Sequence, residues 1–211
     1  MDIKQQAFEV AKIFEKNNPN PKTELVHKNE YELAVSVMLS AQTTDKKVNQ
    51  VTPKLFSKYP NWESLANADV EEVKVLIRAV NFHIGKSARL INAAKYILLN
   101  FGGNLPKTIP ELIKISGIAR KSANVITQEV WGIAEGIVVD THISRVSQRL
   151  GFTTNTDPVK IEKDLMALLP KQFWRNFSGA AVLHGRYVCV ARKPNCEICL
   201  LNKLCPSAFK A

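Results

Sequence analysis

The chain has 211 residues, which is enough to bury a sizeable core in one large domain or two small ones. A hydrophobic fraction of 45% excludes disordered and fibrous classes of protein. No apolar run approaches the roughly 18–20 residues that cross a bilayer, and the N-terminus lacks a secretory signal, so we expect a cytoplasmic protein without a membrane partner. The 29 Lys and Arg outnumber the 19 Asp and Glu, and the net charge of +10 favours an anionic partner such as nucleic acid.

Apolar residues at helical spacing predict a series of short helices. In chain order, these apolar stripes occupy 7–14, 33–41, 88–97, 143–150 and 165–169. Clusters of Asn, Pro and Gly interrupt the pattern at 17–21, 59–61, 101–106, 132 and 155–158. The only stretch that resembles a strand, 136–139, has four residues. We therefore predict an all-α fold, with candidate domain boundaries at 17–22 and 132–136.

Residues 111–126 predict two helices joined by a tight turn. Gly117 supplies the backbone conformation that such a turn needs and that larger residues resist. The backbone N–H groups at the start of the second helix would then form an anion site, which can hold a DNA phosphate without reading the base sequence. Ala119 is small enough for a close approach of the backbone. A glycine turn also joins many ordinary helix pairs, so the longer pattern that continues into Arg120 carries this prediction.

Lys121 follows this turn directly, and its chemistry has two interpretations. As an ammonium it would contact phosphate or solvent. As a nucleophile it must be a neutral amine, and both the positive end of the helix and the charge of Arg120 favour that form. The residues alone leave both interpretations open.

The segment 138–146 presents a carboxylate after a short apolar run and before a helix. Asp140 suits the N-cap position of that helix. A capping carboxylate is also rigid and charged, so it could stabilise positive charge that develops on a sugar. Asp140 and Lys121 are 19 residues apart, and because a helix and a loop would separate them, both could face one cleft. His142 is expected to have a structural, hydrogen-bonding role.

All four cysteines of the chain are clustered, and they are Cys189, Cys196, Cys199 and Cys205. Clustered thiols in a reducing compartment indicate a metal site rather than a disulfide framework. Four thiolates can hold zinc or an iron–sulfur cluster. One close pair with two outlying cysteines favours a single 4Fe–4S cluster, with zinc as the alternative. Arg192 and Lys193 lie between the first two cysteines and could contact phosphates.

Together these motifs resemble the endonuclease III family, bifunctional DNA glycosylases and AP lyases of the helix-hairpin-helix superfamily. The resemblance extends over almost the whole chain. It is carried, in family order, by LSAQTTD at 39–45, ISGIARKSAN at 115–124, VDTH at 139–142, LHGR at 183–186 and the spacing of the four cysteines.

The resemblance implies a two-lobed, all-α fold. One lobe would be a six-helix barrel domain with the hairpin, residues 23–133, and the other an iron–sulfur domain, residues 1–22 and 134–211. Double-stranded DNA with damaged bases or abasic sites would bind between them. The family further implies a monomeric base-excision repair enzyme with a 4Fe–4S cluster, associated with the nucleoid of a prokaryotic cytoplasm.

Residue by residue, the resemblance assigns roles to the candidate site. Lys121 matches the family's lysine nucleophile and Asp140 its catalytic aspartate. The expected DNA contacts are Gln42, Phe82, Gly117, Ala119, Arg120, Arg192 and Lys193. The implied reaction removes oxidised pyrimidines, forms a Schiff base with the sugar and cuts the strand 3′ to the abasic site by β-elimination.

The chain departs from the family pattern at three places. Ser116 and Ala119 stand where the family hairpin has Pro and Gly, and the segment 81–87 differs from the family loop. These departures leave a mismatch glycosylase specific for thymine as one alternative. A DNA-binding module without catalysis, in which Lys121 and Asp140 are incidental, is the alternative from another class.

Overall fold

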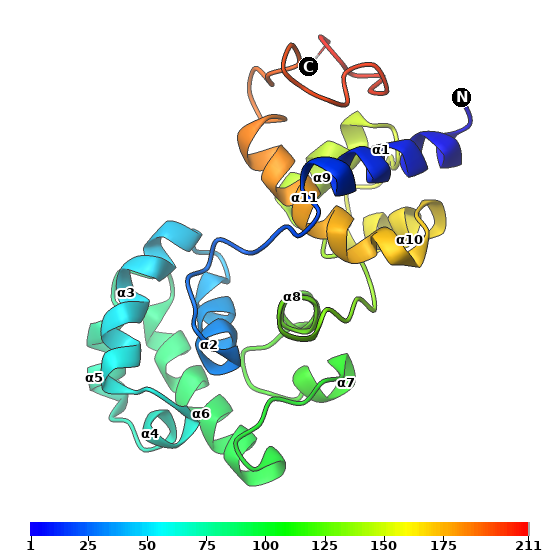
Figure 1. Cartoon of the computed structure of the whole chain (residues 1–211). Coiled ribbons are helices and arrows are strands. Elements are labelled where there is room, and N and C mark those ends of the chain that lie inside the picture. Colours follow the sequence, from blue (N-terminus) through cyan, green and yellow to red (C-terminus); the bar gives the residue numbers. More distant parts are fainter. Residues whose placement is uncertain (211) are drawn as a thin grey trace. The chain divides into compact units, whose positions relative to one another are not determined.

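The structure is a computed structural model that describes residues 1–210, and within that range it consists of helices and loops with no strand (Figure 1). The all-α prediction is confirmed. The apolar stretch 136–139 lies in a loop, and the backbone N–H of Val138 donates to Ser178 Oγ at 3.1 Å rather than to a neighbouring strand. No helix in the described range is long and apolar enough to span a bilayer.

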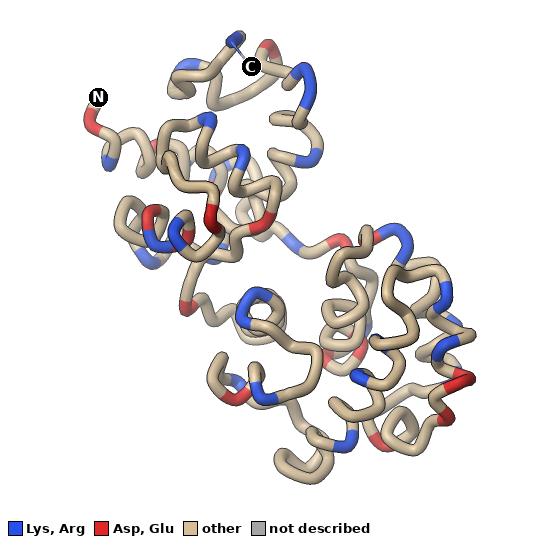
Figure 2. The backbone as a smooth tube through the Cα atoms, turned by 180° about the vertical axis from the view of Figure 1, so that it is seen from behind, with Lys and Arg blue, Asp and Glu red and all other residues tan. Residues whose placement is uncertain are grey.

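The chain divides into two compact units. Unit 1 joins Met1–Lys22 to the C-terminal part that begins at Gly132, and unit 2 is the continuous segment Thr23–Trp131. Each unit has its own apolar core. Unit 1 has 15 Lys and Arg against 9 Asp and Glu, and unit 2 has 14 against 10, so both carry an excess of positive charge (Figure 2).

Unit 2 is built around a buried central helix. Its helices are α2 (Glu30–Ser40), α3 (Asp45–Lys58), α4 (Trp62–Ala66), α5 (Val70–Leu76), α6 (His83–Phe101), α7 (Ile109–Leu112) and α8 (Arg120–Trp131). Helix α2 is apolar on almost every side, and it contacts α3, α6 and α8. A helix buried all round has no polar face to orient it, so the neighbouring helices fix its position.

Unit 1 brings the N-terminal helix against the C-terminal half of the chain (Figure 1). Its helices are α1 (Ile3–Asn17), α9 (Thr141–Arg149), α10 (Pro158–Leu168), the 3₁₀ turn η1 (Lys171–Phe173) and α11 (Trp174–Tyr187). The predicted apolar stripe of α1 is buried, and the helix packs on α10 and α11. Gln6 Nε2 donates to the carbonyls of Leu150 at 2.9 Å and Leu204 at 2.8 Å, so the first helix is also hydrogen-bonded to segments distant in sequence.

Most helix ends fall at the predicted breaks. Helix α6 ends before Gly102, which has φ +58°, and α8 ends before Gly132, which has φ +70°. Helix α10 begins at Pro158 behind the capping side chain of Asp157. These are the expected uses of glycine after a helix and of proline in its first turn.

Candidate metal centre and active-site segments

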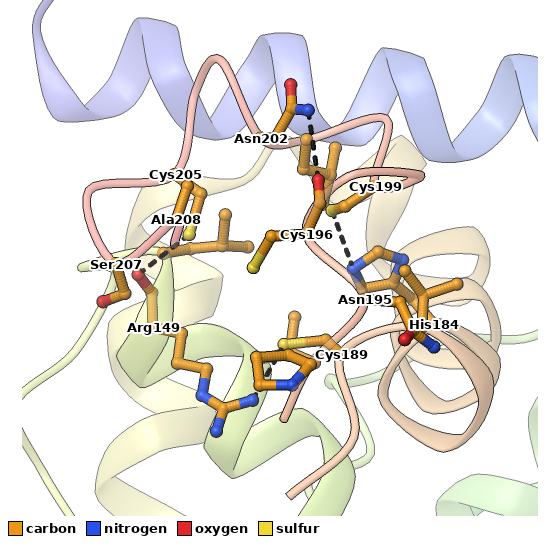
Figure 3. A pocket seen from close by; sticks show the side chains of 15 residues that line it. Arg149, His184, Cys189, Asn195, Cys196, Cys199, Asn202, Cys205, Ser207 and Ala208 are labelled. Atoms are coloured by element: carbon orange, nitrogen blue, oxygen red, sulfur yellow. Dashed lines mark hydrogen bonds between the residues drawn. The ribbon is translucent and has the colours of Figure 1, made fainter. Parts of the chain in front are cut away.

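The four cysteines line one cavity in unit 1, between α9, the C-terminal end of α11 and the loop 189–205 (Figure 3). All four are free and partly buried. Their side chains turn toward the same space, although the cysteines are spread over 17 residues of chain. The rest of the lining is largely apolar, and it includes Val146, Leu150, Val188 and Leu201.

Four thiols that line one cavity are a donor set that fits an iron–sulfur cluster. A single zinc ion takes the same four donors at about 2.3 Å from one point. Burial raises the pKa of Cys199 and Cys205, and the neighbouring thiols act in the same direction. Loading with metal therefore has to displace protons.

Two arginines of α9 hold the start of the cysteine loop. Arg145 Nε donates to the Cys189 carbonyl at 3.0 Å. Arg149 Nη1 donates to Cys189 Sγ at 3.3 Å and to the Val190 carbonyl at 2.7 Å, and its Nη2 donates to the Ala191 carbonyl at 3.0 Å. The two arginines share one helix face, since they are four residues apart. This spacing was the sequence signal for their common role.

The motif LHGR at 183–186 joins α11 to both the loop and α9. The His184 carbonyl accepts from Val188 N at 2.9 Å and from Cys189 N at 2.7 Å, and its ring Nε2 lies 3.6 Å from Cys199 Sγ. Burial lowers the pKa of His184 to about 4, so its ring is neutral at physiological pH. A Cβ added at Gly185 would lie 2.8 Å from His142 Cβ, so this glycine permits the close crossing of α9 and α11.

Asp140 is the N-cap of α9. Its Oδ1 accepts from His142 N at 2.9 Å and from Ile143 N at 2.8 Å. Among residues 1–210, no group donates to the second carboxylate oxygen, Oδ2. The carboxylate is thus held rigidly by one oxygen at a helix start and keeps the other for a further interaction.

The predicted hairpin is present, but its first helix is short. Helix α7 has four residues, and the chain then turns so that Ile115 and Ile118 are buried. Gly117 has φ +87°, and a Cβ there would lie 3.0 Å from Met38 Cε. The Ala119 carbonyl accepts from Ala123 N at 2.9 Å and so begins α8. The exposed Arg120 and Lys121 are the first two residues of that helix.

Gln42 and Phe82 are the exposed tips of two loops in unit 2. Gln42 has φ +54° and Phe82 has φ +58°, conformations that side chains with a Cβ rarely adopt. Both tips line one surface groove, which Arg89 also lines. Arg89 lies against the hairpin as well, because a Cβ added at Gly117 would be 3.5 Å from Arg89 Cβ. Arg89 is therefore shared by this groove and by the surroundings of Gly117.

The remaining candidates lie in unit 1. Arg192 and Lys193 are exposed in the loop between the first two cysteines, and Lys193 has φ +53°. Lys121 belongs to unit 2 and Asp140 to unit 1.

The sequence marked the segment 81–87 only as a departure from the family loop, and neither the buried Lys86 nor Asn81 was assigned a role from it. Lys86 is 5% exposed. A signal was available, because Lys86 shares the helical phase of the apolar Leu90, Ala93 and Ile97.

Family models match most of the chain. A model described as "HhH-GPD superfamily base excision DNA repair protein" matches residues 35–171. A second model, "Iron-sulfur binding domain of endonuclease III", matches residues 189–205, which begin and end at the outermost cysteines.

Individual relatives agree with these models. Endonuclease III of Synechocystis sp. is 45% identical over 205 residues, which cover 97% of this chain and 94% of that protein. The structure of a trapped endonuclease III–DNA covalent intermediate matches with a TM-score of 0.90 at 36% identity, over 99% of this chain and 98% of the other. A thermostable thymine-DNA glycosylase matches with a TM-score of 0.83 at 19% identity, over 99% and 98% of the two chains, which is a likeness of fold alone.

Proposed function

The chain belongs to the endonuclease III family of base-excision DNA repair proteins, and on that premise we propose that Lys121 is its nucleophile and Asp140 its catalytic carboxylate. The observation that carries this proposal is the position of Lys121. It is exposed at the start of α8, directly after the turn at Gly117. A helix start that holds phosphate would bring its amine close to a DNA sugar.

As a member of this family, the protein is a DNA glycosylase with AP lyase activity on oxidised pyrimidines, and it carries a 4Fe–4S cluster. The ligands that we propose are Cys189, Cys196, Cys199 and Cys205. When bound, the cluster would tie the loop 189–205 to α9 and α11. None of the catalytic steps proposed here passes through it.

The proposed reaction begins when a damaged base leaves the stack and enters a protein pocket. The Lys121 amine bonds to C1′ of the sugar as the bond between C1′ and the base breaks. The base leaves with that electron pair and takes up a proton, which balances the proton that the amine loses. The free oxygen of Asp140 is available to stabilise positive charge on the sugar. Ring opening gives a Schiff base, loss of a C2′ proton breaks the 3′ C–O bond, and water then releases Lys121.

The proposed DNA contacts divide by role. Gly117, Ala119 and Arg120 would hold phosphate at the start of α8, and Arg192 and Lys193 would add charge from the cysteine loop. These contacts position the duplex without reading its sequence. Ala119 stands where the family hairpin has glycine, and it is exposed directly before α8.

Gln42 and Phe82 would act on the bases instead. We propose that Gln42 fills the space left by the flipped nucleotide and that Phe82 enters the duplex beside it. Their exposure and their places at the tips of two neighbouring loops support these roles.

Two coarser features complete the proposal. Unit 2 would be the barrel domain with the hairpin, and unit 1 the iron–sulfur domain. The protein would bind damaged or abasic duplex as a monomer, on the nucleoid of a prokaryotic cell. Bacterial relatives support this setting.

Borohydride trapping tests the nucleophile. The protein is incubated with abasic duplex DNA and sodium borohydride, which reduces a Schiff base to a stable adduct. The parent protein should form the adduct, and Lys121→Ala should lose it. The matched control is Lys114→Ala, because Lys114 is an exposed lysine of the same hairpin.

Two results would contradict the proposal. If Lys121→Ala still forms the adduct at the parental rate, another amine is the nucleophile. If the parent protein binds the duplex but forms no adduct, the chain acts as a DNA-binding module instead.

A further inference from the structure

Lys86 is a buried ammonium group whose hydrogen bonds all go to one short segment of the chain. Its Nζ donates to the carbonyls of Leu39 and Ala41, both at 2.7 Å, and to Thr43 Oγ1 at 3.0 Å. An ammonium group has three N–H donors, so these three acceptors satisfy it completely. Lys86 therefore has no donor left for a ligand.

The three acceptors lie at the end of α2, where the chain leaves the helix. The last carbonyls of a helix have no partner within it and carry partial negative charge. Lys86 satisfies the Leu39 and Ala41 carbonyls and supplies the complementary charge. It thereby fixes the direction in which the chain continues into Gln42.

Asn81 holds the same segment from the other side. Its Nδ2 donates to the Gln42 carbonyl at 2.6 Å, and its backbone N–H donates to Thr43 Oγ1 at 3.2 Å. Ala41, Gln42 and Thr43 are thus each hydrogen-bonded to the segment 81–86. Both neighbours of Gln42 are bonded to Lys86.

The same two residues flank the second tip. Phe82 follows Asn81, and its carbonyl accepts from Lys86 N at 3.0 Å, which starts α6. The Phe82 side chain is 66% exposed, and no side chain caps this start of α6. Phe82 and Gln42 both hold left-handed backbone conformations, which persist only where the surrounding structure fixes them.

We infer that Lys86 and Asn81 are positioning residues that lock the loops of Gln42 and Phe82 into one rigid element for entry into the DNA duplex. This inference rests on the proposed roles of Gln42 and Phe82. The two tips have to enter neighbouring places in the duplex at the same time. A fixed spacing avoids the cost of ordering two loops when DNA binds.

Two substrates that contain the same reactive sugar should respond differently when the tips are loosened. An abasic site in a duplex needs the tips, since the duplex must be opened around it. The same abasic strand without its complement presents the sugar directly. Loosening the tips should therefore slow reaction with the duplex and spare reaction with the single strand.

The test uses Lys86→Met and Asn81→Ala in the iron-loaded, full-length protein. Lys86→Met keeps the length of the side chain and removes its charge and donors. Asn81→Ala removes only the bond to the Gln42 carbonyl. The matched controls are Lys95→Met, an exposed lysine on the same helix, and Asn100→Ala, whose side chain donates only to the Tyr96 carbonyl of its own helix at 2.9 Å.

Two measurements are made on each variant. The first is the initial rate of borohydride-trapped adduct with the abasic duplex and with the abasic single strand. The second is the fluorescence of 2-aminopurine placed opposite the abasic site, which rises when the tips unstack it. We expect Lys86→Met to slow the duplex reaction by about tenfold or more, because a misplacement of about 1 Å can cost about a hundredfold. Asn81→Ala should have a smaller effect in the same direction.

The single-strand rate of both variants should stay at the parental value, and the fluorescence rise should shrink. Equal losses on the two substrates, or parental duplex rates and fluorescence in both variants, would overturn the inference. If Lys86→Met does not fold, Asn81→Ala decides alone. A parent protein that raises the fluorescence but forms no adduct would refute the nucleophile proposed above and leave this inference standing.

Discussion

Replacing Gly185 by alanine should force apart the two helices that frame the cysteine loop. The added Cβ would lie 2.8 Å from His142 Cβ, 3.2 Å from Val146 Cγ2 and 3.3 Å from His142 Cα. Carbon atoms in contact normally stay about 3.5–4.0 Å apart. Because one of the three atoms belongs to the backbone of α9, a change of rotamer cannot relieve the clash.

The expected loss of stability follows from two opposing effects. Overpacking of a core costs about 1–3 kcal/mol. Alanine in place of glycine inside a helix returns about 0.5–1 kcal/mol. We therefore expect the free energy of unfolding of unit 1 to fall by about 1 kcal/mol, the middle of a difference that reaches at most about 2.5 kcal/mol. Cluster retention should fall with it, because the displaced helix also carries Arg145 and Arg149.

Urea unfolding of the loaded protein measures this effect. Far-ultraviolet circular dichroism follows both units, and the visible absorption of the cluster follows unit 1. The matched control is Gly85→Ala in α6, because a Cβ added there would meet no atom within 4 Å beyond its chain neighbours and the backbone of its own helix. This control should unfold at the parental urea concentration or above it. A parental midpoint for Gly185→Ala, or an equal drop in the control, would refute the packing argument.

Three further predictions concern charge. Asp140→Asn keeps a good N-cap and removes the carboxylate charge. Base release in a single turnover should therefore slow by about a hundredfold, with little change in DNA binding, and a parental rate would contradict the role of Asp140. Arg149→Met leaves the Val190 and Ala191 carbonyls without their donor. The visible absorption of its cluster should therefore decay faster in air than that of the parent or of the control Lys163→Met, which replaces an exposed lysine of α10. Equal decay would show that Arg149 does not retain the cluster. DNA affinity should fall steeply as salt rises, because phosphate contacts release counterions, and a flat response would argue against a phosphate-dominated interface.

The helical architecture was largely predictable because its determinants are local. The apolar stripe of α1 lies at helical spacing, and Gly102, Gly132 and Pro158 mark helix ends through backbone conformations that the sequence discloses. The grouping of the cysteines was also local, since all four lie within 17 residues. Local signals of this kind need no knowledge of packing.

The missed features depend on contacts between distant residues. Lys86 bonds to residues more than 40 positions earlier, and the cost of burying its charge is offset only by those acceptors. Arg149 bonds to residues about 40 positions later. Helix α7 is also shorter than the spacing of the apolar residues predicts, since it ends at Leu112 while Ile115 and Ile118 are buried beyond it.

The hydrogen bonds of Gln6 have a consequence for the order in which the chain can fold during synthesis. Unit 2 is continuous, so all of its residues have left the ribosome soon after Trp131 is added. Helix α1 is made first, yet its partner Leu204 is added almost at the end of the chain. Since domains generally fold as units during synthesis, unit 2 can be complete while α1 still lacks its partners. Iron would then bind to a chain in which unit 2 has already folded.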